Sequence, residues 1–165
     1  MKFLPDQGIS LLIGDDDRRV DLWAAGLAAL FGELCLLLDV RKVNGPAVKA
    51  LVSTKQLMIF LNCCDSESPV NTLTWINGVY DMFVGGKEQV VIHTHNPLVM
   101  DAFNQCLPRV HVLQTGTEDP IMLVDLITEK AQRSACLSRL WMDGELLSGV
   151  FDEDWEKAWA DVTEL

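Results

Sequence analysis

Two hydrophobic patterns alternate along the first 118 residues. Short continuous apolar runs, typical of strands in a buried parallel sheet, occur at 8–14, 34–40, 56–64, 88–94 and 109–116. Between these runs, apolar residues recur at helical spacing in 21–34, 69–86 and 96–107, and 44–53 is a candidate turn and short helix. The alternation predicts an α/β fold with three αβα layers, in which helices cover both faces of a mostly parallel sheet.

The pattern changes after residue 118, where most of the chain shows helical periodicity. The final stretch places four large apolar side chains on one helix face: Phe151, Trp155, Trp159 and Val162. From Asp143 onward the chain carries eight acidic residues and one lysine, so the opposite face is negative. We expect a single domain, 1–165, with an α/β core over 1–118 and a mainly helical, acidic C-terminal extension over 119–165.

Composition narrows the class of protein. The 165 residues are 49% hydrophobic, which is enough for one core and too little chain for two ordinary domains. With 13 Lys and Arg against 24 Asp and Glu, the net charge of −11 disfavours direct binding to nucleic acid. The apolar runs are too short for a membrane span or a signal peptide. The five cysteines are typical of reduced, buried thiols. Both observations predict a cytoplasmic protein without membrane contact.

Two histidines end the strand predicted at 88–94 and are the best local candidates for chemistry. His93 and His95 flank a threonine, so they share one strand face at the carboxyl end, where open α/β sheets bind ligands. Asn96 and Pro97 then open a helix. The two rings fit either a metal-binding pair that lacks a third ligand or a hydrogen-bonded polar rim.

The same stretch, QVVIHTHNPLVMDAF, resembles the switch-histidine region of ABC-type ATPases of the SMC and RecF-like class. In that family a strand ends in a Thr-Thr-His-Ser-Pro type sequence, and the histidine contacts the γ-phosphate of ATP. The matching residue is His95, and His93 stands at the first threonine. The opening stretch GISLLIGDDDRRVDLWAAGLAALFG is similar to the strand, phosphate loop and helix with which these ATPases begin.

The phosphate loop of the family, GxxxxGK[ST], is broken in this chain. Gly14 keeps the first glycine, but Arg19, Val20 and Asp21 stand at the second glycine, the lysine and the hydroxyl residue. The chain therefore lacks the close backbone approach, the phosphate-pairing lysine and the Mg²⁺-binding hydroxyl. The aspartates at 15–17 add negative charge, and one like-charge pair at about 4 Å costs roughly 4 kcal/mol at an effective dielectric of about 20.

The other motifs of the family are also altered or missing in this chain. The Asp-Glu pair that organises Mg²⁺ and activates water corresponds to Asn62 and Cys63, and neither residue is a general base. The signature sequence and the long helical arm are missing, although the segment LSRLWMDGELLSGVFDEDW is similar to the end of such ATPases.

This resemblance implies a relative without hydrolysis and without a cofactor. The resemblance also implies that the chain keeps a remnant of the nucleotide pocket, formed by Gly14, Arg18, Arg19 and His95. Such a chain is expected to act by binding a protein partner, either an active ATPase of the same class or a second copy of itself, with Trp155 and Trp159 as candidate anchors.

Two alternatives stay open. The chain also resembles TOPRIM nucleases, which implies an Mg²⁺ site built from Asp16, Asp65 and Glu67, although Ile13 stands where that family has glutamate. A nucleotide or phospholigand sensor would use Arg18, Arg19 and His95. The simplest expectation for the aspartates is structural: Asp17 or Asp21 caps a helix that starts at Leu22.

Overall fold

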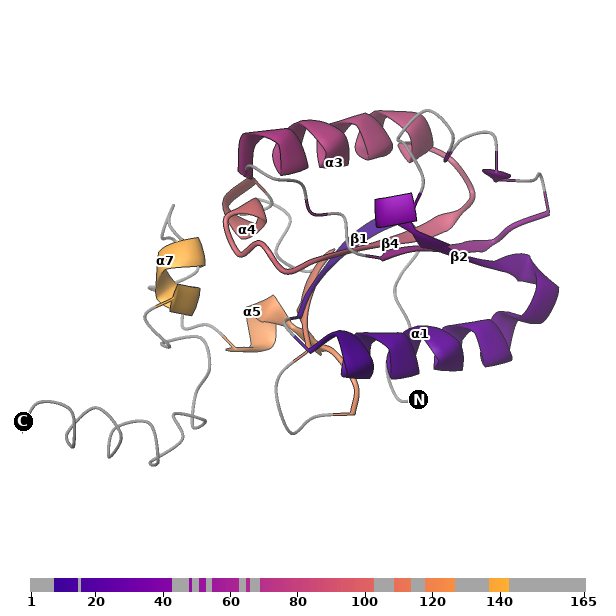
Figure 1. The fold of residues 1–165 in the computed structure, drawn as a ribbon, viewed down its shortest axis with the longest axis horizontal. Coiled ribbons are helices and arrows are strands. Elements are labelled where there is room, and N and C mark those ends of the chain that lie inside the picture. Colours follow the sequence, from indigo (N-terminus) through magenta and orange to yellow (C-terminus); the bar gives the residue numbers. More distant parts are fainter. Residues whose placement is uncertain are drawn as a thin grey trace, which may run out of the picture.

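A mixed sheet forms the centre of the molecule (Figure 1). The computed structural model describes residues 8–14, 16–42, 48, 51–52, 55–62, 65, 69–102, 109–113, 118–126 and 137–142. Within them the strands are β1 (Gly8–Ile13), β2 (Cys35–Asp39), β3 (Met58–Asn62), β4 (Gln89–Thr94), β5 (Val110–Val112) and β6 (Ile121–Met122). They are ordered β2-β3-β4-β1-β5-β6, and only β6 is antiparallel to its neighbour. The predicted α/β class with a mostly parallel sheet is confirmed.

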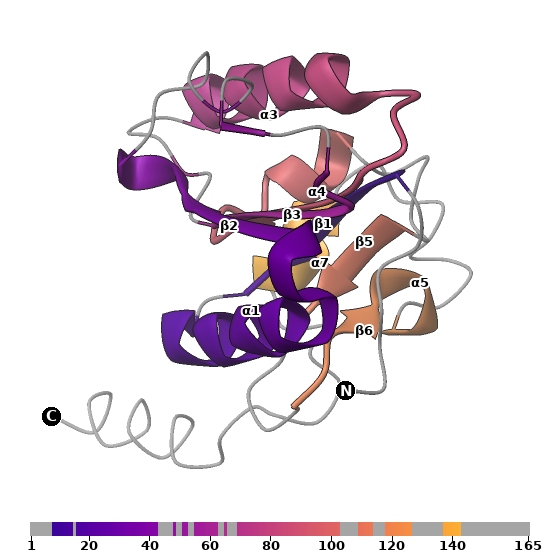
Figure 2. The same cartoon turned by 90° about the vertical axis from the view of Figure 1, so that its right-hand side faces the viewer.

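Two long helices lie on opposite faces of this sheet. Figures 1 and 2 show α1 (Asp17–Phe31) on one face and α3 (Pro69–Phe83) on the other, which is compatible with three αβα layers. The shorter elements are η1 (Gly32–Leu34), η2 (Val40–Lys42), α4 (Val99–Ala102), α5 (Leu123–Leu126) and α7 (Leu137–Met142). Of the helix predicted at 96–107, α4 is the part that the structure describes as helical, and 103–107 lies outside the described residues.

The core has two halves because successive side chains of a strand point to opposite faces. On the α3 side, Ile9, Leu11 and Ile13 of β1 pack with Ile76 and Val79. On the α1 side, the intervening Leu12 packs in a cluster that contains Val20, Trp23, Leu27 and Phe60. β3, between β2 and β4, is buried on both faces from Met58 to Leu61, as its continuous apolar run predicts.

The start of α1 corrects the sequence prediction. The helix begins at Asp17 rather than near Leu22, and neither Asp17 nor Asp21 caps it. Asp16 is the N-cap: its Oδ1 accepts hydrogen bonds from the backbone N–H groups of Arg18 and Arg19, at 3.1 and 3.3 Å. Three consecutive aspartates are all suitable caps, and which one adopts the extended N-cap backbone depends on where β1 ends.

The described part of the region after residue 118 joins the core at two places. β6 extends the sheet beside β5. The carboxylate of Asp101 in α4 accepts hydrogen bonds from the backbone N–H and the hydroxyl of Ser138, at 3.1 and 2.6 Å, and so holds the start of α7. The predicted apolar face at Phe151, Trp155, Trp159 and Val162 lies outside the described residues. No helix in the described ranges is long and apolar enough to cross a membrane.

Candidate functional site

Three neighbouring strands bring their carboxyl ends to one edge of the sheet. β4 lies between β3 and β1, and all three are parallel, so Asn62, Thr94 and Gly14 meet where these strands end. This edge carries a group of hydrogen-bonded polar side chains, which we call the polar cluster: Asp17, Asp21, Asn62, Asp65, His93 and His95. Ligands of open α/β sheets bind at such edges.

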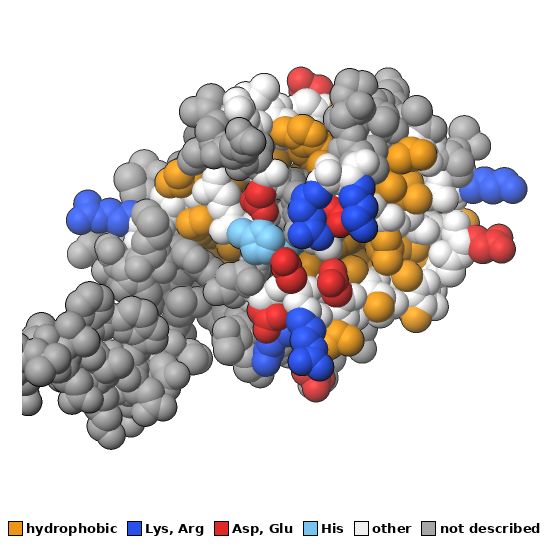
Figure 3. Space-filling model, in the orientation of Figure 1, with side chains coloured by type: hydrophobic (Ala, Val, Ile, Leu, Met, Phe, Trp, Pro, Cys, Tyr) orange, Lys and Arg blue, Asp and Glu red, His pale blue; other side chains and the backbone are white. Residues whose placement is uncertain are grey.

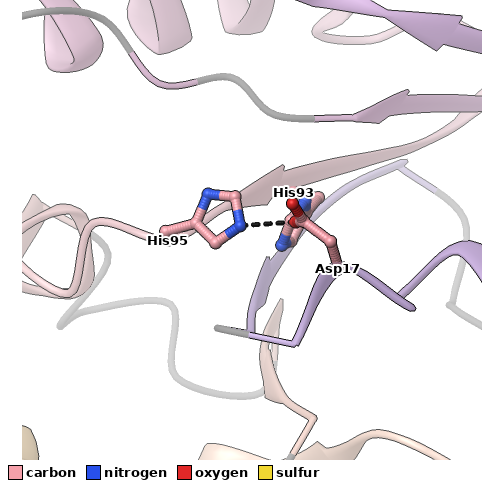
Figure 4. Close-up of side chains that lie close together, drawn as sticks. All are labelled: Asp17, His93 and His95. Atoms are coloured by element: carbon pink, nitrogen blue, oxygen red, sulfur yellow. Dashed lines mark hydrogen bonds and ion pairs between the residues drawn. The ribbon is translucent and has the colours of Figure 1, made fainter. Parts of the chain in front are cut away.

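His95 connects two elements of the polar cluster. Its Nδ1 lies 2.5 Å from Oδ2 of Asp65, which follows β3. Its Nε2 lies 2.6 Å from Oδ1 of Asp17, in the first turn of α1, and Figure 4 shows this second contact. Burial lowers the pKa of His95, but the hydrogen bonds to the two carboxylates outweigh that effect and raise the pKa overall. The imidazole therefore ties the start of α1 to the chain after β3.

Asp65 holds the chain after β3 against the end of β4. Its carboxylate accepts hydrogen bonds from the Thr94 hydroxyl and from the His95 backbone N–H, the latter at 3.1 Å to Oδ1 and 3.2 Å to Oδ2. Burial raises the pKa of this carboxyl, but the hydrogen bonds from Thr94 and His95 outweigh it, so the pKa lies below the usual value. Asp65 is thus an ionised acceptor for three donors of two neighbouring residues.

His93 is the buried member of the cluster, with 0% of its surface exposed. Its Nδ1 lies 2.7 Å from Oδ1 of Asn62, and its Nε2 lies 2.9 Å from the carbonyl oxygen of Gly14. Burial lowers the pKa of His93, and the contact with Gly14 opposes that effect only in part. The ring stands 4.8 Å from that of His95, centroid to centroid, so the two histidines share one side of the strand, as their spacing predicts.

Asn62 and Asp21 complete the cluster on the side of α1. The Asn62 Nδ2 donates to Oδ1 of Asp21 at 3.0 Å, and this bond orients the amide so that its oxygen faces His93. A chain of polar contacts therefore runs from Asp21 through Asn62 and His93 to the backbone of Gly14.

The remaining candidate residues are placed differently. Arg18 is exposed, and Arg19 pairs with Asp16 through a contact of 3.2 Å between Nε and Oδ2. Val20 of α1 is fully buried, so this position points into the core. Asp15, Cys63 and Glu67 lie outside the described residues.

The surface around the cluster carries mixed charge (Figure 3). A histidine side chain is visible among acidic side chains, and basic side chains lie beside them. Among the basic residues, Arg41 donates two hydrogen bonds of 2.9 Å to the Asp39 carboxylate, and Lys42 lies 3.8 Å from the same carboxylate, so the charges of Arg41 and Lys42 are partly neutralised. The hydrogen bond from Arg41 lowers the pKa of Asp39.

No protein-family model, curated protein or solved structure matches the chain.

Sequence reasoning identified both histidines and Asp65 but gave Asp17, Asp21 and Asn62 no positive part in a site. The available signal was positional: polar residues directly after buried parallel strands meet at one edge. For Asp17 that signal was obscured by its aspartate neighbours, because the sequence does not show that Asp17 faces His95 whereas Asp16 caps the helix.

Proposed function

We propose that this chain is a relative of ABC-type ATPases that has lost nucleotide chemistry and acts by binding a protein partner. The contact between Asp21 and Asn62 carries the proposal. In the family alignment these positions correspond to the hydroxyl residue and the aspartate that share Mg²⁺. Here the two side chains lie 3.0 Å apart and bond to each other, which supports the alignment and leaves a direct hydrogen bond where the family has a shared ion.

The arrangement of the strands supports the same proposal. A nucleotide site of this kind needs the phosphate loop, the catalytic strand and the switch histidine to converge on one ligand. The corresponding strands β1, β3 and β4 are neighbours and end at the same edge. Their order in the chain is the one that the resemblance implies, and their common edge supports the proposal.

Loss of nucleotide binding is supported by the backbone after β1. A phosphate loop cradles phosphates with the N–H groups of an open, glycine-rich segment. In this chain only residues 14–16 separate β1 from α1, and the first N–H groups of the helix are directed to the Asp16 side chain. The lysine position is the buried Val20.

His95, at the position of the switch histidine, already has hydrogen-bond partners within the chain for both ring nitrogens. His95 contacts Asp65 and Asp17 through its two ring nitrogens, so a γ-phosphate would have to displace a carboxylate to reach it. A phosphate there would also lie beside the carboxylates of Asp17 and Asp65, which repel it. A fold that keeps the arrangement without the chemistry is suited to interaction with a protein.

Calorimetric titration with ATP, ADP and GTP, each with and without Mg²⁺, tests the loss of nucleotide binding. We expect no binding heat for any of them. Binding of Mg²⁺-ATP that weakens at least tenfold in His95→Ala would overturn the proposal. Binding of phosphate compounds that is lost in Arg18→Ala but does not need Mg²⁺ would favour the phospholigand sensor instead.

Light scattering over a range of concentrations, followed by titration with a purified active ATPase of the same class, tests the partner role. We expect either a dimer of this chain or a defined complex with the ATPase. A monomer that binds neither would contradict the proposed interaction.

The nuclease alternative requires the carboxylates of Asp16 and Asp65 to converge on one metal ion. The Asp16 carboxylate is directed to Arg18 and Arg19, whereas that of Asp65 is directed to Thr94 and His95. The geometry therefore favours the interaction role. Mg²⁺- or Mn²⁺-dependent cleavage of DNA that disappears in Asp65→Ala would reverse this preference.

A further inference from the structure

We propose that Asp17, His93 and His95 form a binding site for a transition-metal dication of the zinc type. Among the described residues, these three bring one ligand atom each to within 4.8 Å of one another (Figure 4). The two histidines alone lacked a third ligand, and the fold supplies it from the first turn of α1, 76 residues earlier in the chain than His93. This inference goes beyond the interaction role proposed above and does not depend on it.

The donor set indicates the class of metal. Two imidazole nitrogens and one carboxylate oxygen are common ligands of Zn²⁺, Co²⁺ and Ni²⁺, whereas Mg²⁺ and Ca²⁺ prefer oxygen ligands. Zinc bonds of about 2.0–2.1 Å in a tetrahedral site place ligand atoms about 3.3 Å apart. The longest separation, 4.8 Å, must therefore contract, and the 2.6 Å between His95 Nε2 and Asp17 Oδ1 must widen. The Asp17 side chain, which is 52% exposed, has the freedom to move.

The surroundings of His95 orient it for a metal. Its Nδ1 faces Asp65 at 2.5 Å, so the tautomer with a proton on Nδ1 directs the lone pair of Nε2 toward Asp17. A carboxylate behind the ring is the usual outer partner of a metal-bound histidine, which it orients and makes more basic. A metal ion would take the position of the proton that Nε2 and Asp17 now share.

His93 supplies the second imidazole, from inside the fold, where 0% of its surface is exposed. Its two ring nitrogens lie 2.7 Å from Oδ1 of Asn62 and 2.9 Å from the carbonyl oxygen of Gly14. A neutral imidazole carries one N–H, which can donate to one of these oxygen atoms, and its other nitrogen carries the lone pair that binds a metal ion.

Metal binding is measured by calorimetry with Zn²⁺ and by visible absorption with Co²⁺ on the full chain, after removal of metals with a chelator. We expect one ion per chain, a Co²⁺ spectrum of a four- or five-coordinate site, a higher Tm with Zn²⁺ and no effect of Mg²⁺. The five cysteines are a competing source of binding, and a thiolate charge-transfer band in the near ultraviolet identifies them.

Two neighbouring aspartates offer a matched pair of variants. Asp17→Asn removes the proposed ligand charge and is expected to weaken Zn²⁺ binding at least tenfold. Asp16→Asn keeps a good N-cap and is expected to leave binding unchanged within twofold. His95→Gln provides a second ligand variant at an accessible position, and circular dichroism verifies that each variant is folded.

Equal Zn²⁺ affinities in the two aspartate variants would overturn the site, as would a Co²⁺ spectrum dominated by thiolate bands or no binding at millimolar Zn²⁺. None of these results bears on nucleotide binding, so the failure of this inference is distinguishable from the failure of the proposed function.

Discussion

The Asp65 carboxylate is expected to be the strongest single polar contribution to the stability of the site. Asp65→Ala removes the acceptor of three donors: the Thr94 hydroxyl, the His95 backbone N–H and the His95 ring N–H. A hydrogen bond to a charged group contributes about 1.5–3 kcal/mol. The Asp65 side chain is 27% exposed, so water replaces part of what is lost, and we expect a decrease of about 2–4 kcal/mol in the free energy of unfolding.

Asp65→Asn removes the charge of the side chain and keeps its shape. The amide oxygen can still accept from Thr94 and from the His95 backbone, but the amide NH₂ replaces the acceptor that faces the His95 ring. We therefore expect about half the loss of the alanine variant, about 1–2 kcal/mol. The difference between the two losses would measure the effect of the Asp65 charge on the free energy of unfolding. The rest of the alanine loss would belong to the hydrogen bonds that the asparagine keeps.

Urea unfolding followed by circular dichroism, with a chelator present to exclude metal, measures both variants. Asp81→Ala on the exposed side of α3 is the control and is expected to change the free energy of unfolding by no more than about 0.5 kcal/mol. A loss below about 1 kcal/mol for Asp65→Ala would refute the reasoning, because the carboxylate would then contribute no more than an ordinary surface group.

Two further predictions concern the scaffold. Phe60→Ala removes a ring that is 1% exposed and packs edge-on to Trp23, with ring centroids 6.0 Å apart. We expect the free energy of unfolding in urea to fall by about 3–5 kcal/mol. A decrease under about 1 kcal/mol would argue against the packing on the α1 side. Asp101→Ala removes both hydrogen bonds to Ser138 and is expected to cost about 1–3 kcal/mol and to increase amide hydrogen exchange in α7; unchanged exchange there would show that Asp101 does not hold this helix.

The hydrophobic pattern predicted most of the described fold because parallel strands buried on both faces give continuous apolar runs. The runs at 56–64 and 88–94 became β3 and β4, and the helical spacing in 69–86 became α3. β2 shows the limit of this reasoning: its apolar sequence reads like a central strand, yet it lies at one end of the sheet order, and its Leu37 is 43% exposed. The order of strands depends on crossovers that no local pattern encodes.

The sequence by itself determined the kinds of element and the ends of the strands at which polar residues gather. It also bears on the proposed loss of nucleotide chemistry, because Arg19, Val20 and Asp21 differ from the glycine, lysine and hydroxyl residue of a phosphate loop. Only the tertiary structure decided which polar side chains meet. The adjacency of β3, β4 and β1 joins Asn62 and Asp65 to the histidines, and the early start of α1 directs Asp17 rather than Asp16 to His95. These contacts join residues 30 or more positions apart, and such distances are set by sheet order and by the exact end of β1, not by local sequence preference.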